Sequence, residues 1–265
     1  MLEPLPVLRP PDRPPSVYAR HLPAATALEW LAAGWDDFRD RPWTSITFGL
    51  LLVLLSYGVL AGLNAAHLLY LALPAISGFL IVGPFFALGL YEKSRRRAAG
   101  QRFTLGDMVF VRPASGTQLA YAGLLLCLWV LFWLRAADLL YALFFGLTPF
   151  PGAREALLNV FSSPQGWGLI VVGGAVGGLF AAFAFAISAF SVPMLMAKKT
   201  DALTALGLSF TMTTHNLPVA LAWAAIVVAG IALSVATALV GLVVIFPVLG
   251  HGTWHAYRAI GGKGG

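Results

Sequence analysis

Charged side chains are scarce in this chain of 265 residues. Asp, Glu, Lys and Arg make up 11% of it, whereas hydrophobic residues make up 59%. Soluble globular domains carry about 25% charged residues, so an ordinary water-soluble domain is excluded. The apolar residues come in long blocks and the mean hydropathy is +0.82. Both features indicate that lipid surrounds most of the chain.

Cysteine and intramembrane acids are almost absent too. Cys127 is the single cysteine, which excludes a disulfide framework and a cysteine-based metal site. The sequence contains no phosphate-binding glycine loop, hydrolase nucleophile motif or metalloprotease motif. Asp138 is the only acid inside a predicted span, whereas proton pumps and ion-coupled carriers normally use more. We therefore expect a protein that is not an enzyme and that needs no cofactor or metal.

The apolar blocks predict an all-α membrane protein with six transmembrane helices. About 20 apolar residues in a helix cross the hydrocarbon layer. The last block, 217–257, would be twice too long as one helix, so we expect a turn near 229–234, where Gly230 and Ser234 are the turn-tolerant residues. The predicted spans are 46–66, 68–91, 118–141, 168–196 and two within 217–257. Prolines crowd the N-terminus, which predicts a disordered cytoplasmic tail over 1–25 and a membrane domain over 26–260.

The basic residues predict the orientation of these spans. If the chain starts inside, 15 of the 17 Lys and Arg residues fall in inside segments. Such a bias is what the positive-inside rule describes. The net charge of +6 therefore indicates cytoplasmic helix ends rather than a nucleic-acid partner. We expect a multi-pass protein of the bacterial inner membrane with both termini in the cytoplasm.

A recurring pattern predicts that the spans form three hairpins. An amphipathic stretch and a proline precede each odd span, in 28–42, 103–113 and 201–218. Each even span carries a proline near its inner end, where a helix would kink: Pro84, Pro193 and Pro247. The stretches therefore predict amphipathic helices at the membrane surface, and in the first of them Leu28 falls on the apolar side and Asp37 outside it. The alternative is that prolines simply occur often near the ends of membrane helices.

Several short strings carry a resemblance to a known family. They are Ala-Gly-Trp-Asp-Asp-Phe at 33–38 and the segments 78–84, 89–95, 134–146, 191–195 and 252–258. Together these strings resemble a bacterial family of predicted integral membrane proteins of undefined function, some of whose members carry a cytochrome c oxidase subunit label. The resemblance implies a six-span inner-membrane protein and supplies no catalytic residues. A haem-copper subunit needs several facing histidines, and this chain has five in all.

Two charged residues interrupt the third predicted span. Arg135 and Asp138 are three residues apart, so they share a helix face and can pair. Charge within a membrane span is costly and usually has a partner or a pathway. We expect a structural ion pair near the outer interface. A contact with a substrate or ion, and a contact with a partner protein or lipid, are the alternatives.

Two histidines are four residues apart on the last predicted span. His251 and His255 could approach one metal ion or one haem edge. No Cys, Asp or Glu lies nearby in the sequence to complete such a site. The alternative is that His255 belongs to the aromatic and basic cluster 254–258, which is typical of a membrane interface.

A basic run follows the second predicted span. Lys93, Arg95, Arg96 and Arg97 could form a patch that binds anionic lipid or a partner. The alternative is that the run only sets the orientation. In the fourth predicted span, glycines at 173, 177, 174 and 178 predict close helix packing, with a homodimer face as the alternative.

Three functions remain open from the sequence. The first is a non-enzymatic accessory, assembly or scaffold factor for other membrane components. The second is a small-molecule or lipid carrier with a site between hairpins near Pro84, Pro193 and Pro247, where freed carbonyl groups can line a cavity. The third is a respiratory-chain subunit similar to a cytochrome oxidase. The expected partners are the lipid bilayer and either a membrane protein or a second copy.

Overall fold

The computed structural model describes residues 16–68, 72–146 and 153–262. All regular secondary structure in these ranges is helical, which confirms the all-α prediction. Twelve helices are present in this part of the chain. They are α1 (Thr26–Arg39), α2 (Pro42–Ala65), α3 (Ala72–Phe86), α4 (Leu88–Ala98), α5 (Leu105–Val109), α6 (Gly116–Phe145), α7 (Ala153–Ser162), α8 (Pro164–Ser188), α9 (Ser191–Ala197), α10 (Ala202–Thr214), α11 (Leu217–Ala236) and α12 (Leu242–Gly261).

Four helical segments within the described ranges are long and apolar enough to cross a membrane. They are Pro42–Ala65, Gly116–Phe145, Pro164–Ala197 and Leu217–Ala236. The other two predicted spans differ from them. Helix α3 has only 15 residues, and α12 is 20 residues long but carries polar side chains in its second half. The prediction of six spans therefore has direct support in length and composition for four of them.

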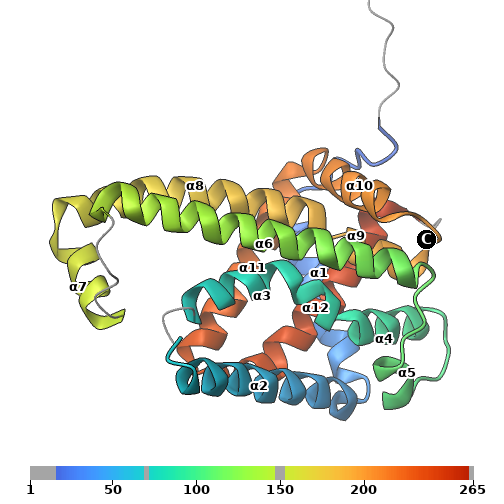
Figure 1. Cartoon of the computed structure of the whole chain (residues 1–265). Coiled ribbons are helices and arrows are strands. Elements are labelled where there is room, and N and C mark those ends of the chain that lie inside the picture. The colour runs from blue at the N-terminus through green and yellow to red at the C-terminus, as the bar shows by residue number, and fades with distance from the viewer. Residues whose placement is uncertain (1–15, 69–71, 147–152, 263–265) are drawn as a thin grey trace, which may run out of the picture.

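The longest helices form a hairpin that reaches beyond the rest of the molecule. Helices α6 and α8 lie side by side, and α7 closes their far end (Figure 1). Helices α4, α5 and α10 and the C-terminal end lie at the opposite end (Figure 1). Large apolar side chains on the hairpin are exposed, among them Leu139, Leu143 and Leu179, as expected for helices that face lipid.

Helix α1 packs on α12 through a close backbone approach. Its buried face includes Ala27, Trp30 and Gly34. A Cβ atom on Gly34 would lie 2.5 Å from the carbonyl oxygen of Val248, so only glycine allows this crossing. Leu28, which the predicted amphipathic stretch assigned to its apolar face, is 61% exposed. The close packing against α12 therefore determines which face of α1 is buried.

The three prolines act differently on their helices. After Pro84 the chain breaks between α3 and α4, and the amide of Ala87 bonds the carbonyl of Gly83 at 3.2 Å. Pro193 is the third residue of α9, which follows a break after α8. Pro247 lies inside a continuous α12. The kinks predicted at the three prolines therefore correspond to helix breaks near Pro84 and Pro193, whereas the helix continues through Pro247.

The predicted turn at 229–234 is wrong. Helix α11 continues to Ala236, and the turn occupies residues 237–241. Ser234 stays helical, and its hydroxyl donates to the carbonyl of Gly230 at 2.9 Å. The chain reverses at Ala238 and Leu239, which both have positive φ. Membrane helices tolerate glycine and serine well, so these residues were poor markers of a turn.

The described end of the N-terminal tail contacts the helices. Asn216, between α10 and α11, is 1% exposed. Its side chain accepts from the amide of Arg20 at 3.0 Å and donates to the carbonyl of Tyr18 at 2.6 Å. The Arg20 side chain donates to the carbonyl of Ile260 at 3.3 Å. The start and the end of the described chain therefore lie against each other; residues 1–15 of the predicted tail lie outside the described ranges.

Candidate functional sites

Polar side chains gather in the interior where α1, α2, α4 and α12 meet. We call this set the buried polar cluster. Its members are Asp37, Ser45, Lys93, Ser94, Arg97, His251 and His255. Five of them are buried, whereas Arg97 and His255 lie at the edge of the cluster and are partly exposed. Each of its polar groups must be hydrogen-bonded, because an unpaired buried polar group is costly.

His251 lies at the centre of the buried polar cluster and is fully buried. Its Nδ1 lies 3.1 Å from the carbonyl oxygen of Leu90 and 2.7 Å from the hydroxyl of Ser94. Its Nε2 lies 3.0 Å from the hydroxyl of Ser45. A carbonyl oxygen can only accept, so these partners assign the proton of a neutral ring to Nδ1. Nε2 then accepts the Ser45 hydroxyl proton.

Lys93 extends the chain of hydrogen bonds on the other side of Ser45. Its ammonium donates to the Ser45 hydroxyl at 2.9 Å and lies 3.4 Å from the carbonyl oxygen of Arg41. It also lies 5.3 Å from the ring centre of Phe103. The side chain has 0% exposure, and no carboxylate of the described residues contacts the ammonium directly. Burial lowers the pKa of Lys93 to about 8.

Asp37 forms the other end of the buried polar cluster. One carboxylate oxygen pairs with Arg97, and the other lies 2.8 Å from Nε2 of His255. Burial alone would raise the pKa of Asp37, but hydrogen bonds with His255, Ser94 and Arg97 outweigh it and hold the pKa well below the usual range. Asp37 is therefore a buried, ionised carboxylate that binds Arg97 of α4 and His255 of α12.

The buried polar cluster connects four helices through hydrogen bonds. It ties α1, α2 and α4 to α12 through successive hydrogen bonds, and its members line none of the three pockets described in this molecule. The two histidines bind different partners, Ser45 and Ser94 for His251 and Asp37 for His255. Within the described residues, no group of three or more His, Cys, Asp or Glu could hold a metal ion.

The sequence did not single out Asp37, Ser45 or Ser94. The amphipathic pattern predicts that Asp37 lies on the polar side of its helix. A signal was nevertheless present, because Ala27, Trp30, Gly34 and Asp37 fall at spacings of three and four residues and so share a face of α1. An acid on the same face as a tryptophan and a glycine indicates a buried acid.

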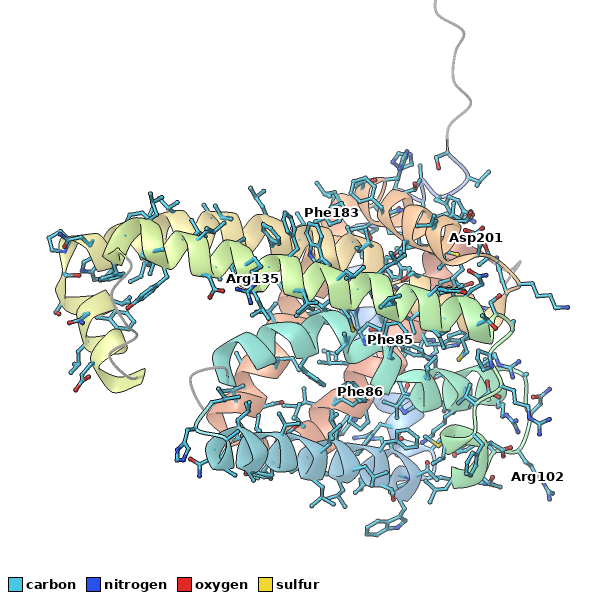
Figure 2. All side chains as sticks on the ribbon, viewed as in Figure 1. Phe85, Phe86, Arg102, Arg135, Phe183 and Asp201 are labelled. Atoms are coloured by element: carbon cyan, nitrogen blue, oxygen red, sulfur yellow. The ribbon has the colours of Figure 1, made fainter. Side chains whose placement is uncertain are left out.

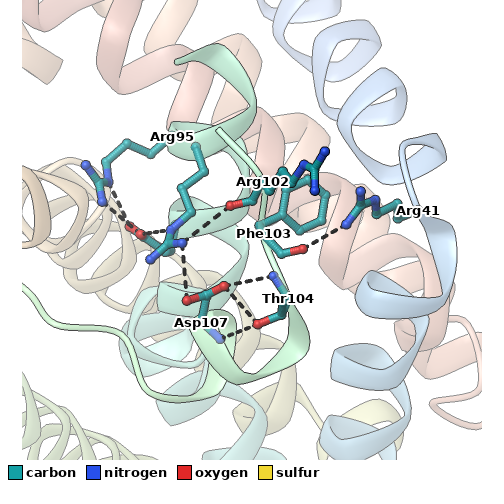
Figure 3. Close-up of polar contacts among 8 residues, drawn as sticks. Arg41, Arg95, Arg102, Phe103, Thr104 and Asp107 are labelled. Atoms are coloured by element: carbon teal, nitrogen blue, oxygen red, sulfur yellow. Dashed lines mark hydrogen bonds and ion pairs between the residues drawn. The ribbon is translucent and has the colours of Figure 1, made fainter. Parts of the chain in front are cut away.

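The predicted basic patch differs from the observed arrangement. Lys93 is in the interior because α4 packs against α2 and α12, so it takes no part in a surface. The three arginines each pair with a carboxylate. Glu92 accepts from Arg95 at 2.7 and 2.8 Å and from Arg96 at 2.6 Å (Figure 3). Burial favours the neutral form of Glu92, but these hydrogen bonds lower its pKa below the usual value.

The predicted ion pair lies on an open face of α6 (Figure 2). Arg135 Nη1 is 3.2 Å from Asp138 Oδ2, and the two side chains are 81% and 68% exposed. Apolar neighbours Leu131 and Leu139 are exposed on the same helix. The described pair therefore lies among side chains that would face lipid or another membrane protein.

The glycines of α8 make unequal contacts. A Cβ atom on Gly177 would lie 3.0 Å from the ring of Trp133 on α6, which fits close packing. Gly174 and Gly178 have open space where a Cβ atom would be. The homodimer face therefore stays a prediction.

An apolar pocket of about 430 Å³ lies between α2, α3, α11 and α12. Phe86 lines it from α3 (Figure 2). The other lining residues are Leu52, Leu55, Ser56, Val59, Leu60, Gly78, Phe79, Val82, Ile231, Ser234, Val235, Leu239 and Leu242. A second pocket, of about 80 Å³, reaches Pro84, whereas Pro193 and Pro247 line none of the described pockets. Of the three prolines, only Pro84 therefore lines a described pocket.

A comparison with known protein families agrees with the long apolar helices and their exposed apolar side chains. The family model described as "Predicted integral membrane protein (DUF2189)" matches residues 72–197. These residues, a little under half of the chain, are similar to that family. The predicted resemblance is thereby confirmed for α3 to α9, and the description names neither an activity nor an oxidase. Neither a curated protein nor a solved structure matches the chain.

Proposed function

We propose that this integral membrane protein is a non-enzymatic lipid-binding protein, and that the apolar pocket between α2, α3, α11 and α12 holds one hydrocarbon chain. The ligand would be a lipid or a small molecule with a lipid-like tail. The observation that carries this proposal is the pocket itself. Its volume of about 430 Å³ is in the range of small-molecule sites.

The chemistry of the lining supports an apolar ligand. Among the lining residues that the structure describes, Ser56 and Ser234 are the two with a side-chain hydroxyl. Ser56 donates to the carbonyl of Leu52 at 2.8 Å, and Ser234 donates to that of Gly230. Both donors are used inside their own helices. A bound chain would therefore meet no unpaired hydroxyl among the described lining residues.

Photocrosslinking tests this proposal directly. The protein is reconstituted with a phospholipid that carries a photoactivatable group in its acyl chain, and the labelled peptides are identified. We expect labelling of α2 and α11, reduced several-fold by Val59→Phe, which fills the pocket. Leu54→Phe is the matched control, because Leu54 is on α2, is 66% exposed and does not line the pocket. Equal labelling in all three proteins would show ordinary contact with bulk lipid and refute the proposal.

Six crossings with both termini at the cytoplasmic face of a bacterial inner membrane are part of the same proposal. The hydrogen bonds of Arg20 to Ile260 and Asn216 support a common side for the two ends. The clustered basic residues of α4 support the cytoplasmic side. The test is labelling with a membrane-impermeant thiol reagent in a Cys127→Ala background. Ala19→Cys and Gly262→Cys should react only after the membrane is opened, whereas Asn64→Cys should react in intact cells. Labelling of either terminus from outside would overturn this topology.

An accessory role is a second candidate, favoured by the exposed pair on α6. An exposed ion pair among lipid-facing side chains is costly unless another protein or headgroups cover it. A second copy or another membrane protein would provide that cover. Light scattering in mild detergent should give a protein mass above the 28.2 kDa of one chain, and an Arg135→Ala/Asp138→Ala variant should return to one chain. A monomeric natural protein would remove the second-copy form of this candidate.

A further inference from the structure

A charged pocket lies at the end of the molecule that carries α4 and α5. Its volume is about 340 Å³. It is lined by Glu92, Arg95, Arg96, Gly106, Asp107, Phe110 and Arg112. We propose that this pocket binds the phosphate group of an anionic phospholipid. The site is separate from the apolar pocket, so this proposal does not depend on the function proposed above.

Glu92 and Asp107 hold the side chains of two arginines in position, so that their remaining N–H groups can bind an anion. Glu92, whose side chain is 6% exposed, holds Arg95 through Nε and Nη2 and holds Arg96 through Nε. Asp107 lies 3.2 Å from Nη1 of Arg96 (Figure 3). The side-chain contacts described for these two guanidinium groups leave Nη1 of Arg95 and Nη2 of Arg96 to bind a ligand. Positioned guanidinium groups are the usual partners of phosphate oxygens.

The charge of the pocket matches one phosphodiester. Three arginines face two carboxylates, which leaves one net positive charge. A phosphodiester carries one negative charge, so binding would neutralise the pocket. Arg112 is exposed and is not among the residues described as paired with an acid. It is therefore the arginine whose charge the acids do not already offset.

Apolar side chains beside the pocket favour a lipid over free phosphate. Phe110 lines the pocket and is 79% exposed, and Val109 is 54% exposed. Large apolar side chains next to arginines are typical of a segment that lies in the membrane interface. A phospholipid bound there would place its phosphate among the arginines and its glycerol and chains against Phe110.

The test measures phospholipid binding by native mass spectrometry of the full chain in mild detergent. Phosphatidylglycerol is titrated at high salt, where diffuse surface attraction is screened. We expect Arg112→Ala to weaken binding about fivefold, since a basic residue near an anionic group contributes ~1 kcal/mol. Arg102→Ala is the matched control, because Arg102 is exposed on the same segment but does not line the pocket. It should bind like the natural protein.

Three results would overturn this assignment. Equal losses in Arg112→Ala and Arg102→Ala would show general surface attraction. Phosphatidylethanolamine that binds as tightly as phosphatidylglycerol would show that the pocket does not select an anionic headgroup. Inorganic phosphate that displaces the lipid completely at similar concentration would identify free phosphate as the ligand. Conversely, Arg112→Lys should bind more tightly than Arg112→Ala and less tightly than the natural protein, because lysine keeps the charge but loses the paired donors.

Discussion

Replacement of Lys93 by methionine should stabilise the protein. The ammonium is fully buried, and burial lowers the pKa of Lys93 from 10.5 to about 8. This difference corresponds to roughly 3 kcal/mol of unfavourable free energy for the charged form at neutral pH. Methionine removes that cost but leaves the Ser45 hydroxyl and the Arg41 carbonyl without one donor, at ~1 kcal/mol. We expect Lys93→Met to gain about 2 kcal/mol in the free energy of unfolding at pH 7.

The pH dependence separates this explanation from a simple packing effect. The folded state binds the Lys93 proton less tightly than the unfolded state does. The cost is therefore complete below pH 8 and disappears as the pH rises from about 8 to 10.5. The advantage of Lys93→Met should narrow over this window. Unfolding in mixed detergent micelles at several pH values measures it, with Lys199→Met as the exposed control.

Two outcomes would refute this reasoning about Lys93. An advantage of Lys93→Met that is independent of pH would show that better packing, and not removal of a buried charge, stabilises the variant. A variant less stable than the natural protein at pH 7 would show that the Phe103 ring and the carboxylates of α1 compensate the charge fully.

Two further substitutions test the contacts of α1. Asp37→Asn should cost about 3 kcal/mol at pH 7, because Arg97 and His255 lose a buried charged partner. Hydrogen bonds hold the pKa of Asp37 below its usual value, so the loss of stability should shrink as the pH falls below about 4 in the same unfolding assay. A loss of stability that does not change with pH would contradict an ionised Asp37. Gly34→Val should lower the thermal midpoint in detergent by an amount equivalent to about 1–3 kcal/mol, because its Cβ would meet the α12 backbone. Gly58→Ala, where a Cβ atom has open space, should leave the midpoint unchanged, and an equal effect of both would refute the close crossing.

The sequence predicted the helical class because apolar blocks of membrane length permit little else. Local signals for the start of some helices are also present, although the first span is expected only from residue 46. Pro42 starts α2, and Asp201 caps α10 by accepting from the amide of Thr204 at 2.9 Å. These features depend on local chemistry, which a single sequence contains.

The candidate sites were harder to predict because they depend on contacts between distant helices. Lys93 stands in a run of basic residues, and its charge suggested a surface position. It is buried because α4 packs against α2 and α12, and its ammonium donates there to Ser45, 48 residues away in the sequence. The apolar pocket requires helices from both ends of the chain. Composition cannot distinguish side chains that line such a pocket from those that face bulk lipid, since both are apolar.

The contact between Asn216 and the N-terminal segment has a practical consequence for expression. A shortened protein that begins after Leu22 would lose two of the three partners described for the Asn216 amide and keep only the carbonyl of Met212. Each buried group left without a partner costs about 1–3 kcal/mol. Deletions made to remove the proline-rich start should therefore stop before Ser16, and a purification tag is better attached ahead of that residue than substituted for it.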